Sequence, residues 1–84
     1  MAKKEKSEVG SYLRRLRFEN NETQEDMAVK LGVTTPYISL LEQRQPLTKK
    51  LAIKIISIYG LKGKEKDSFV SMVSQDIVSR FWGA

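Results

Sequence analysis

The 84-residue chain contains no cysteine and no histidine. The first absence excludes disulfides and thiolate metal sites, and the second excludes imidazole metal ligands. Together they exclude nucleophilic catalysis by a Ser-His or Cys-His arrangement. The aspartate and glutamate residues form no metal or acid-base constellation in the sequence. We therefore expect a protein that is not an enzyme and that needs no cofactor.

The chain also lacks a long apolar run. No segment approaches the roughly 20 apolar residues that a membrane-spanning helix needs. The lysine-rich start, residues 2–6, is not followed by the hydrophobic core of a signal peptide. We expect no membrane association and a cytoplasmic location, and no segment points to a small-molecule ligand.

The most informative stretch is the segment 23–42, which predicts two short helices joined by a tight turn. Thr23 and Asp26 have the spacing of a capping box, a pattern that satisfies free backbone amides at a helix start. Gly32 directly follows the apolar residues of the first helix. A helix ends readily at such a position, because glycine tolerates a positive φ.

The second of these helices has an inner and an outer side. Thr34 or Thr35 can cap it, and Pro36 falls near its first turn, where the missing amide costs little. Ile38 and Leu41, three residues apart, are its inward positions. The opposite side is then available to contact a partner, and it carries Thr35, Pro36, Ser39, Leu40 and Gln43.

The remaining segments also favour helices, because their apolar residues recur at helical spacing. Three further helices are predicted, at about 7–19, 49–59 and 64–81. The one at 49–59 has Thr48 as a possible cap and is apolar on most of its circumference, which predicts that it is largely buried. The sequence thus predicts an all-α fold of five helices.

We expect a single domain in three parts. Residues 1–6 form a flexible basic arm, because they have no apolar anchor. Residues 7–62 form the core, and residues 63–84 form a C-terminal helix that belongs to the same domain.

The net charge of +5 is unevenly distributed. Residues 48–66 carry six basic and one acidic group, whereas residues 23–47 carry two basic and three acidic groups. Basic flanks around a nearly neutral helix suit a module that binds DNA phosphates with its flanks and bases with its helix. A solvated, lysine-rich surface is the alternative interpretation.

With these segments placed, the chain resembles the phage repressor and Cro-type helix-turn-helix family, also called lambda-repressor-like or XRE-type. The resemblance covers about residues 9–61. It rests on Gly10, Leu13, Leu16, Arg17, Thr23, Gln24, Glu25, Ala28, Leu31, Gly32, Val33, Tyr37, Ile38, Leu41, Glu42 and the stretch 51–60. It implies a lambda-repressor-like domain whose third helix lies in the major groove of double-stranded DNA.

The resemblance also implies which residues meet DNA. The residues expected to read base edges are Thr35, Pro36, Ser39, Leu40 and Gln43. Those expected to bind phosphates are Arg17, Gln24, Thr34, Arg44, Lys49 and Lys50. The sequence departs from the usual pattern, because Pro36 and Leu40 cannot donate bidentate hydrogen bonds. Contacts with thymine methyl groups and DNA shape are then expected to carry more of the specificity. The family often has a glycine where Arg44 stands.

A structural ion pair is a further implication of the resemblance. The family commonly pairs an arginine of the first helix with the glutamate that closes the recognition helix. The corresponding residues here are Arg17 and Glu42. We expect a partly buried salt bridge that fixes the orientation of the third helix, with Arg17 also within reach of a phosphate.

The last helix carries more apolar residues than one face holds. On a helical wheel an arc of about 120° is expected to cover the core, and it contains Phe69, Val70, Val73, Ile77 and Phe81. Met72, Val78 and Trp82 lie outside that arc, which predicts a surface for a second copy or another protein. The alternative is that these three side chains fold back onto the first and fourth helices.

Two functions remain open. The first is a sequence-specific DNA-binding transcriptional regulator, most simply a repressor that binds a palindromic operator as a homodimer. The second is an antitoxin-type interaction protein, whose C-terminal helix binds a protein partner and whose DNA binding is autoregulatory. The two functions differ in what Met72, Val78 and Trp82 contact.

Overall fold

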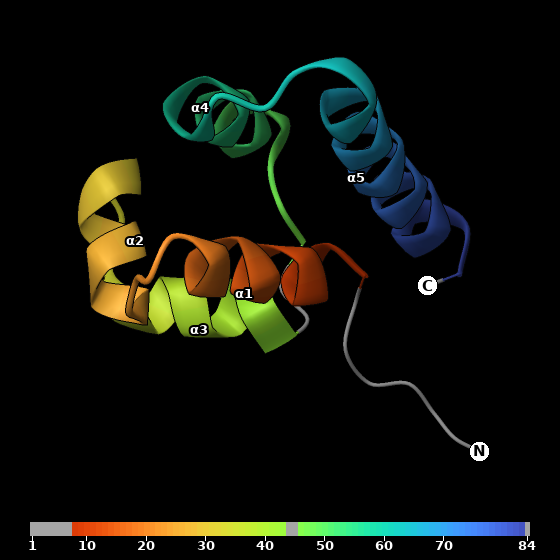
Figure 1. Cartoon of the computed structure of the whole chain (residues 1–84). Coiled ribbons are helices and arrows are strands. Elements are labelled where there is room, and N and C mark those ends of the chain that lie inside the picture. Colours follow the sequence, from red (N-terminus) through yellow and green to blue (C-terminus); the bar gives the residue numbers. More distant parts are fainter. Residues whose placement is uncertain (1–7, 44–45, 84) are drawn as a thin grey trace. The chain divides into compact units, whose positions relative to one another are not determined.

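The computed structural model describes residues 8–43 and 46–83, with side chains described as far as residue 78. The described residues form helices and no strands: α1 (Glu8–Glu19), α2 (Gln24–Leu31), α3 (Thr35–Gln43), α4 (Lys49–Tyr59) and α5 (Gly63–Gly83) (Figure 1). The prediction of an all-α chain with five helices is confirmed. None of the described helices is both long and apolar enough to cross a membrane.

The packing divides the chain into two compact units, residues 1–45 and 46–84. The second unit contains α4 and α5. The predicted arm at 1–6 lies outside the described residues.

The first unit is built around α3, because both α1 and α2 pack against it. Ile38 and Leu41, the predicted inward positions of α3, are 0% and 1% exposed. The other apolar side chains buried in this unit are Val9, Tyr12, Leu13, Leu16, Met27, Ala28 and Leu31. They recur at helical spacing, which is why α1 and α2 each present one apolar side to the interior.

Local capping fixes where α2 begins and ends and where α3 begins. The Thr23 hydroxyl accepts a hydrogen bond from the Asp26 amide at 3.0 Å, and the Asp26 carboxylate accepts one from the Thr23 amide at 2.9 Å. The predicted capping box is therefore present. Gly32 ends α2 in the left-handed conformation with φ of 71°. Thr34 rather than Thr35 caps α3, because its hydroxyl accepts a hydrogen bond from the Tyr37 amide.

The second unit consists of α4 and α5, which pack against each other. The Thr48 hydroxyl caps α4 by accepting a hydrogen bond from the Leu51 amide, and Gly60 ends the helix with φ of 64°. The buried apolar side chains of this unit are Leu47, Leu51, Ala52, Ile55, Leu61, Phe69 and Val73.

Two burial predictions for the second unit were wrong. The helix at 49–59 was expected to be largely buried, but Ile53 and Ile58 are 58% and 39% exposed. In α5, Val70 and Ile77 were placed toward the core and are 44% exposed each. The buried arc of α5 contains Phe69 and Val73 and is narrower than predicted. A unit of two helices has too little surface to cover every apolar side chain that it carries.

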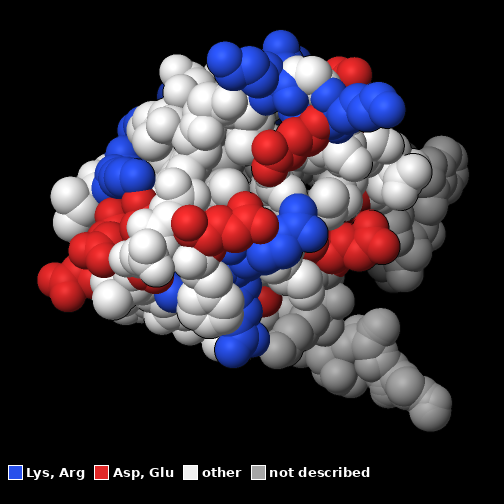
Figure 2. All heavy atoms as spheres, in the orientation of Figure 1, with Lys and Arg blue, Asp and Glu red and all other residues white. Residues whose placement is uncertain are grey.

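Basic side chains gather over the connection between α4 and α5, along the upper edge of the view in Figure 2. Lys62, Lys64 and Lys66 lie in this part of the chain and are exposed. The basic excess predicted for residues 48–66 is therefore at the surface of the second unit.

The crossing of α1 and α3 depends on Gly10. A Cβ atom at this position would lie 2.4 Å from the Glu42 carbonyl oxygen, which belongs to rigid helix backbone. Alanine gains about 1 kcal/mol of helix propensity over glycine, whereas forced overpacking costs about 1–3 kcal/mol. We therefore expect Gly10→Ala to lower the free energy of unfolding in urea, with exposed Ser11→Ala as the control. Unchanged or higher stability of Gly10→Ala would contradict the close approach.

The capping box of α2 is expected to depend on pH. Hydrogen bonds from the Thr23 backbone and side chain hold the pKa of Asp26 below its ordinary value of 3.8. A lowered folded-state pKa means that this stabilisation is fully present above the ordinary pKa and is lost as pH falls through the folded value. An NMR titration of the carboxyl carbon should show the low pKa in the wild type and a value nearer the ordinary one in Thr23→Val. Valine keeps the backbone amide that donates to Asp26, so only the contribution of the Thr23 hydroxyl is removed. Equal pKa values in the two proteins would contradict that contribution of the hydroxyl.

Candidate nucleic-acid interface

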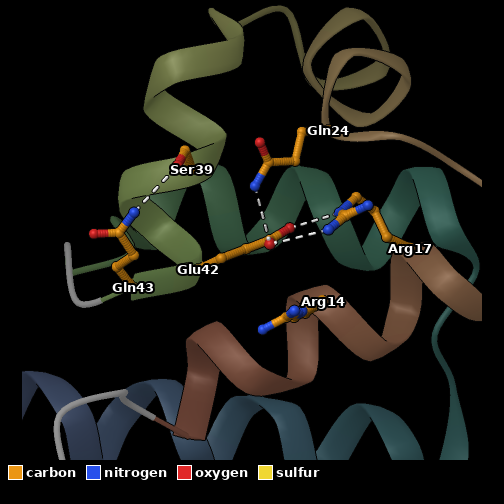
Figure 3. A pocket seen from close by; sticks show the side chains of 6 residues that line it. All are labelled: Arg14, Arg17, Gln24, Ser39, Glu42 and Gln43. Atoms are coloured by element: carbon orange, nitrogen blue, oxygen red, sulfur yellow. Dashed lines mark hydrogen bonds and ion pairs between the residues drawn. The ribbon is translucent and has the colours of Figure 1, made fainter.

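The predicted ion pair between Arg17 and Glu42 joins α1 to α3 in the interior of the first unit. Arg17 Nε lies 2.7 Å from Glu42 Oε2, and Arg17 Nη2 lies 3.1 Å from Oε1, so the pair is bidentate (Figure 3). The two residues are only 8% and 7% exposed. The sequence predicted a partly buried pair, and the structure places it almost fully inside.

Two further contacts extend this pair. Gln24 Nε2 donates a hydrogen bond to Glu42 Oε1 at 3.2 Å, which brings the first residue of α2 into the network. Arg17 Nη1 donates to the Glu22 carbonyl at 3.0 Å. Glu22 in turn forms an ion pair with Lys30 of α2. The network therefore links all three helices of the first unit.

The outward side of α3 carries the five residues that were predicted to read bases. Pro36, Leu40 and Gln43 are exposed, and Thr35 and Ser39 are half-buried. The Gln43 side-chain amide donates to the Ser39 hydroxyl at 3.2 Å, one helical turn away. Leu40 is 48% exposed. All five predicted readers thus remain accessible on one element.

Beside this surface lies a hollow of about 290 Å³, which only polar or charged residues line (Figure 3). Its lining combines Arg14 and Arg17 of α1, Gln24 of α2, and Ser39, Glu42 and Gln43 of α3. Four of these six residues were singled out from the sequence as base or phosphate contacts, and Glu42 as an ion-pair partner. The structure brings them to one place because α1 and α2 both pack on α3.

Arg14 is the lining residue that sequence reasoning missed. It is exposed, and its guanidinium carbon lies 5.8 Å from the centroid of the Phe18 ring, one turn further along α1. Its spacing three residues before Arg17 was the available signal, since residues three apart share one side of a helix.

The other predicted phosphate contacts are distributed over both units. Gln24 is half-buried and engaged with Glu42, whereas Thr34 is exposed at the start of α3. Lys49 and Lys50 are exposed in the first turn of α4, in the second unit. Arg17 is buried against Glu42, which favours its structural role over phosphate binding. Arg44 lies outside the described residues.

The predicted partner surface on α5 is described only in part. Met72 is half-buried and Val78 is 53% exposed. The side chain of Trp82 lies outside the described residues. Val70 and Ile77, which were expected to be internal, are also exposed on this helix.

The Arg17 and Glu42 pair gives a double-mutant prediction. Either Arg17→Met or Glu42→Leu should cost about 3–5 kcal/mol of unfolding free energy, because the partner is left as an uncompensated buried charge. The double variant should cost less than the sum of the two single changes. Urea unfolding followed by circular dichroism measures all three. Additive losses would mean that the two side chains are not coupled.

No protein-family model matches this sequence, and neither a curated protein nor a solved structure matches it. The resemblance to the phage repressor family therefore rests on the residues quoted from the sequence.

Proposed function

We propose that the chain is a sequence-specific DNA-binding transcriptional regulator of the lambda-repressor-like type, with α2 and α3 as its helix-turn-helix. The observation that carries this proposal is the outward surface of α3. Five side chains on one short helix remain accessible, while its inner side is anchored by Ile38, Leu41 and the buried Glu42. A rigid helix with an accessible outer side is what insertion into a major groove requires.

The chemistry of this surface favours a mixed mode of base recognition. Ser39 and Gln43 supply the polar groups, and their mutual hydrogen bond limits the rotamers that Gln43 adopts. Leu40 and Pro36 supply apolar contacts suited to the C5-methyl group of thymine. Burial of the exposed Leu40 side chain against a base would favour binding by about 25 cal/mol per Å² of apolar surface removed from water.

Exposed positive charge in each of the two units supports phosphate binding. Arg14 contributes in the first unit, and Lys49 and Lys50 contribute at the start of α4. Lysines in the first turn of a helix oppose the helix dipole, at a cost of about 0.3–1 kcal/mol each. A bound phosphate would offset that cost. Such contacts hold a protein on the duplex without reading its sequence.

A homodimer is the simplest assembly for such a regulator. Val70, Ile77 and Val78 leave apolar surface exposed on α5. Two copies joined through α5 could present two α3 helices about 34 Å apart, the separation of successive major grooves on one side of the duplex. Met72, which is half-buried on the same helix, is included in this surface. We propose that the protein acts as a repressor in the cytoplasm.

The second candidate is an antitoxin-type protein, and the same exposed apolar side chains of α5 favour it. In that case Val70, Ile77 and Val78 would contact a different protein, and DNA binding would be autoregulatory. Copurification with a stoichiometric second protein would favour this candidate over the homodimer.

Base recognition by α3 can be tested by selecting binding sites from randomised duplexes. We expect the wild type to enrich one class of site. Thr35→Ala combined with Leu40→Ala should enrich that class with lower stringency and leave the fold unchanged, because both side chains point outward. Val29→Ala is the matched control, since Val29 is 76% exposed on α2. If the double variant enriched the same site with the same stringency, base reading by α3 would be contradicted.

A further inference from the structure

The hollow beside α3 contains one more positive than negative side chain. Arg14, Arg17 and Glu42 are its charged lining residues. Arg17 and Glu42 neutralise each other through two hydrogen bonds of 2.7 and 3.1 Å. The charge that remains in the hollow is that of Arg14.

Arg14 is positioned to offer this charge to a ligand. Arg14 forms no ion pair with another described residue, and its side chain is exposed. Its guanidinium carbon lies 5.8 Å from the centroid of the Phe18 ring, within the range of a cation–π contact. In Figure 3 Arg14 and Gln24 lie on opposite sides of Glu42, and no interaction line reaches Arg14.

Neutral donors complete the lining. Ser39 accepts a hydrogen bond from Gln43 and so keeps its own hydroxyl hydrogen for a further acceptor. The side-chain amides of Gln24 and Gln43 each use one N–H in the contacts described, and each amide has a second. One cation surrounded by neutral donors suits a group with a single negative charge and several acceptor oxygens. A phosphodiester of a nucleic-acid backbone has this chemistry.

We propose that this hollow binds one backbone phosphate of the duplex and that Arg14, rather than Arg17, supplies the charge. Arg17 is then a positioning residue, which holds Glu42 and thereby Gln24 at the rim of the site. This inference rests on the proposed DNA-binding function and adds a specific contact to it. Because the contact is to the backbone, it contributes equally to binding of any sequence.

The test compares Arg14→Gln with Arg15→Gln in the full chain. Arg15 is the matched control, because it is the neighbouring exposed arginine and forms an ion pair with Glu19, with Arg15 Nε 3.6 Å from Glu19 Oε2. Fluorescence anisotropy gives the affinity for one labelled duplex across a series of salt concentrations. We expect Arg14→Gln to weaken binding to native and scrambled duplexes alike and to reduce the slope of log K against log salt by about 0.9. Arg14→Lys should keep most of the slope.

The outcomes separate this inference from the function on which it rests. A wild type that binds no duplex would overturn the proposed function. Binding by the wild type with an unchanged slope in Arg14→Gln would overturn the phosphate site alone. Equal losses of slope in Arg14→Gln and Arg15→Gln would also overturn it, because they would indicate diffuse attraction instead of one seated phosphate. Thermal unfolding of each variant checks that the fold is intact.

Discussion

The orientation of α3 depends on the buried pair between Arg17 and Glu42. Removing two charges from water is costly, and only good geometry with additional hydrogen bonds offsets that cost. Both conditions are met here, because the pair is bidentate and the Gln24 amide also donates to Glu42. Each of the three partners comes from a different helix. The pair therefore fixes α1, α2 and α3 relative to one another, and Gly10 permits the close approach of α1 and α3 that this requires.

This arrangement separates structural charge from charge that is available to a ligand. Glu42 neutralises Arg17 in the interior, so the electrostatic attraction of the first unit for a polyanion has to come from exposed residues such as Arg14. The proposed base recognition is separated from stability in the same way, since the side of α3 that holds Glu42 is buried and the side that holds Leu40 is exposed. Mutations on the two sides are expected to affect stability and specificity separately.

Much of this could be predicted from the sequence, because local rules decide it. The capping box of Thr23 and the glycine end of α2 need only neighbouring residues, and the buried and exposed sides of α3 follow from helical period. Arg14 was missed because its proposed role depends on side chains that other helices bring to the same hollow. The burial of Val70 was overestimated because a helical wheel gives the direction of a side chain and not the width of the surface packed against it.

Fluorescence anisotropy of the wild-type protein with two duplexes of equal length tests sequence-specific DNA binding directly. One carries the DNA upstream of its own gene, and the other carries the same bases in scrambled order. Sequence-specific recognition by α3 predicts tighter binding to the upstream duplex, and a preference that persists at physiological salt concentration. Equal affinity for the two duplexes, lost as salt is raised, would contradict sequence-specific recognition by α3 and would leave only non-specific attraction by the basic side chains.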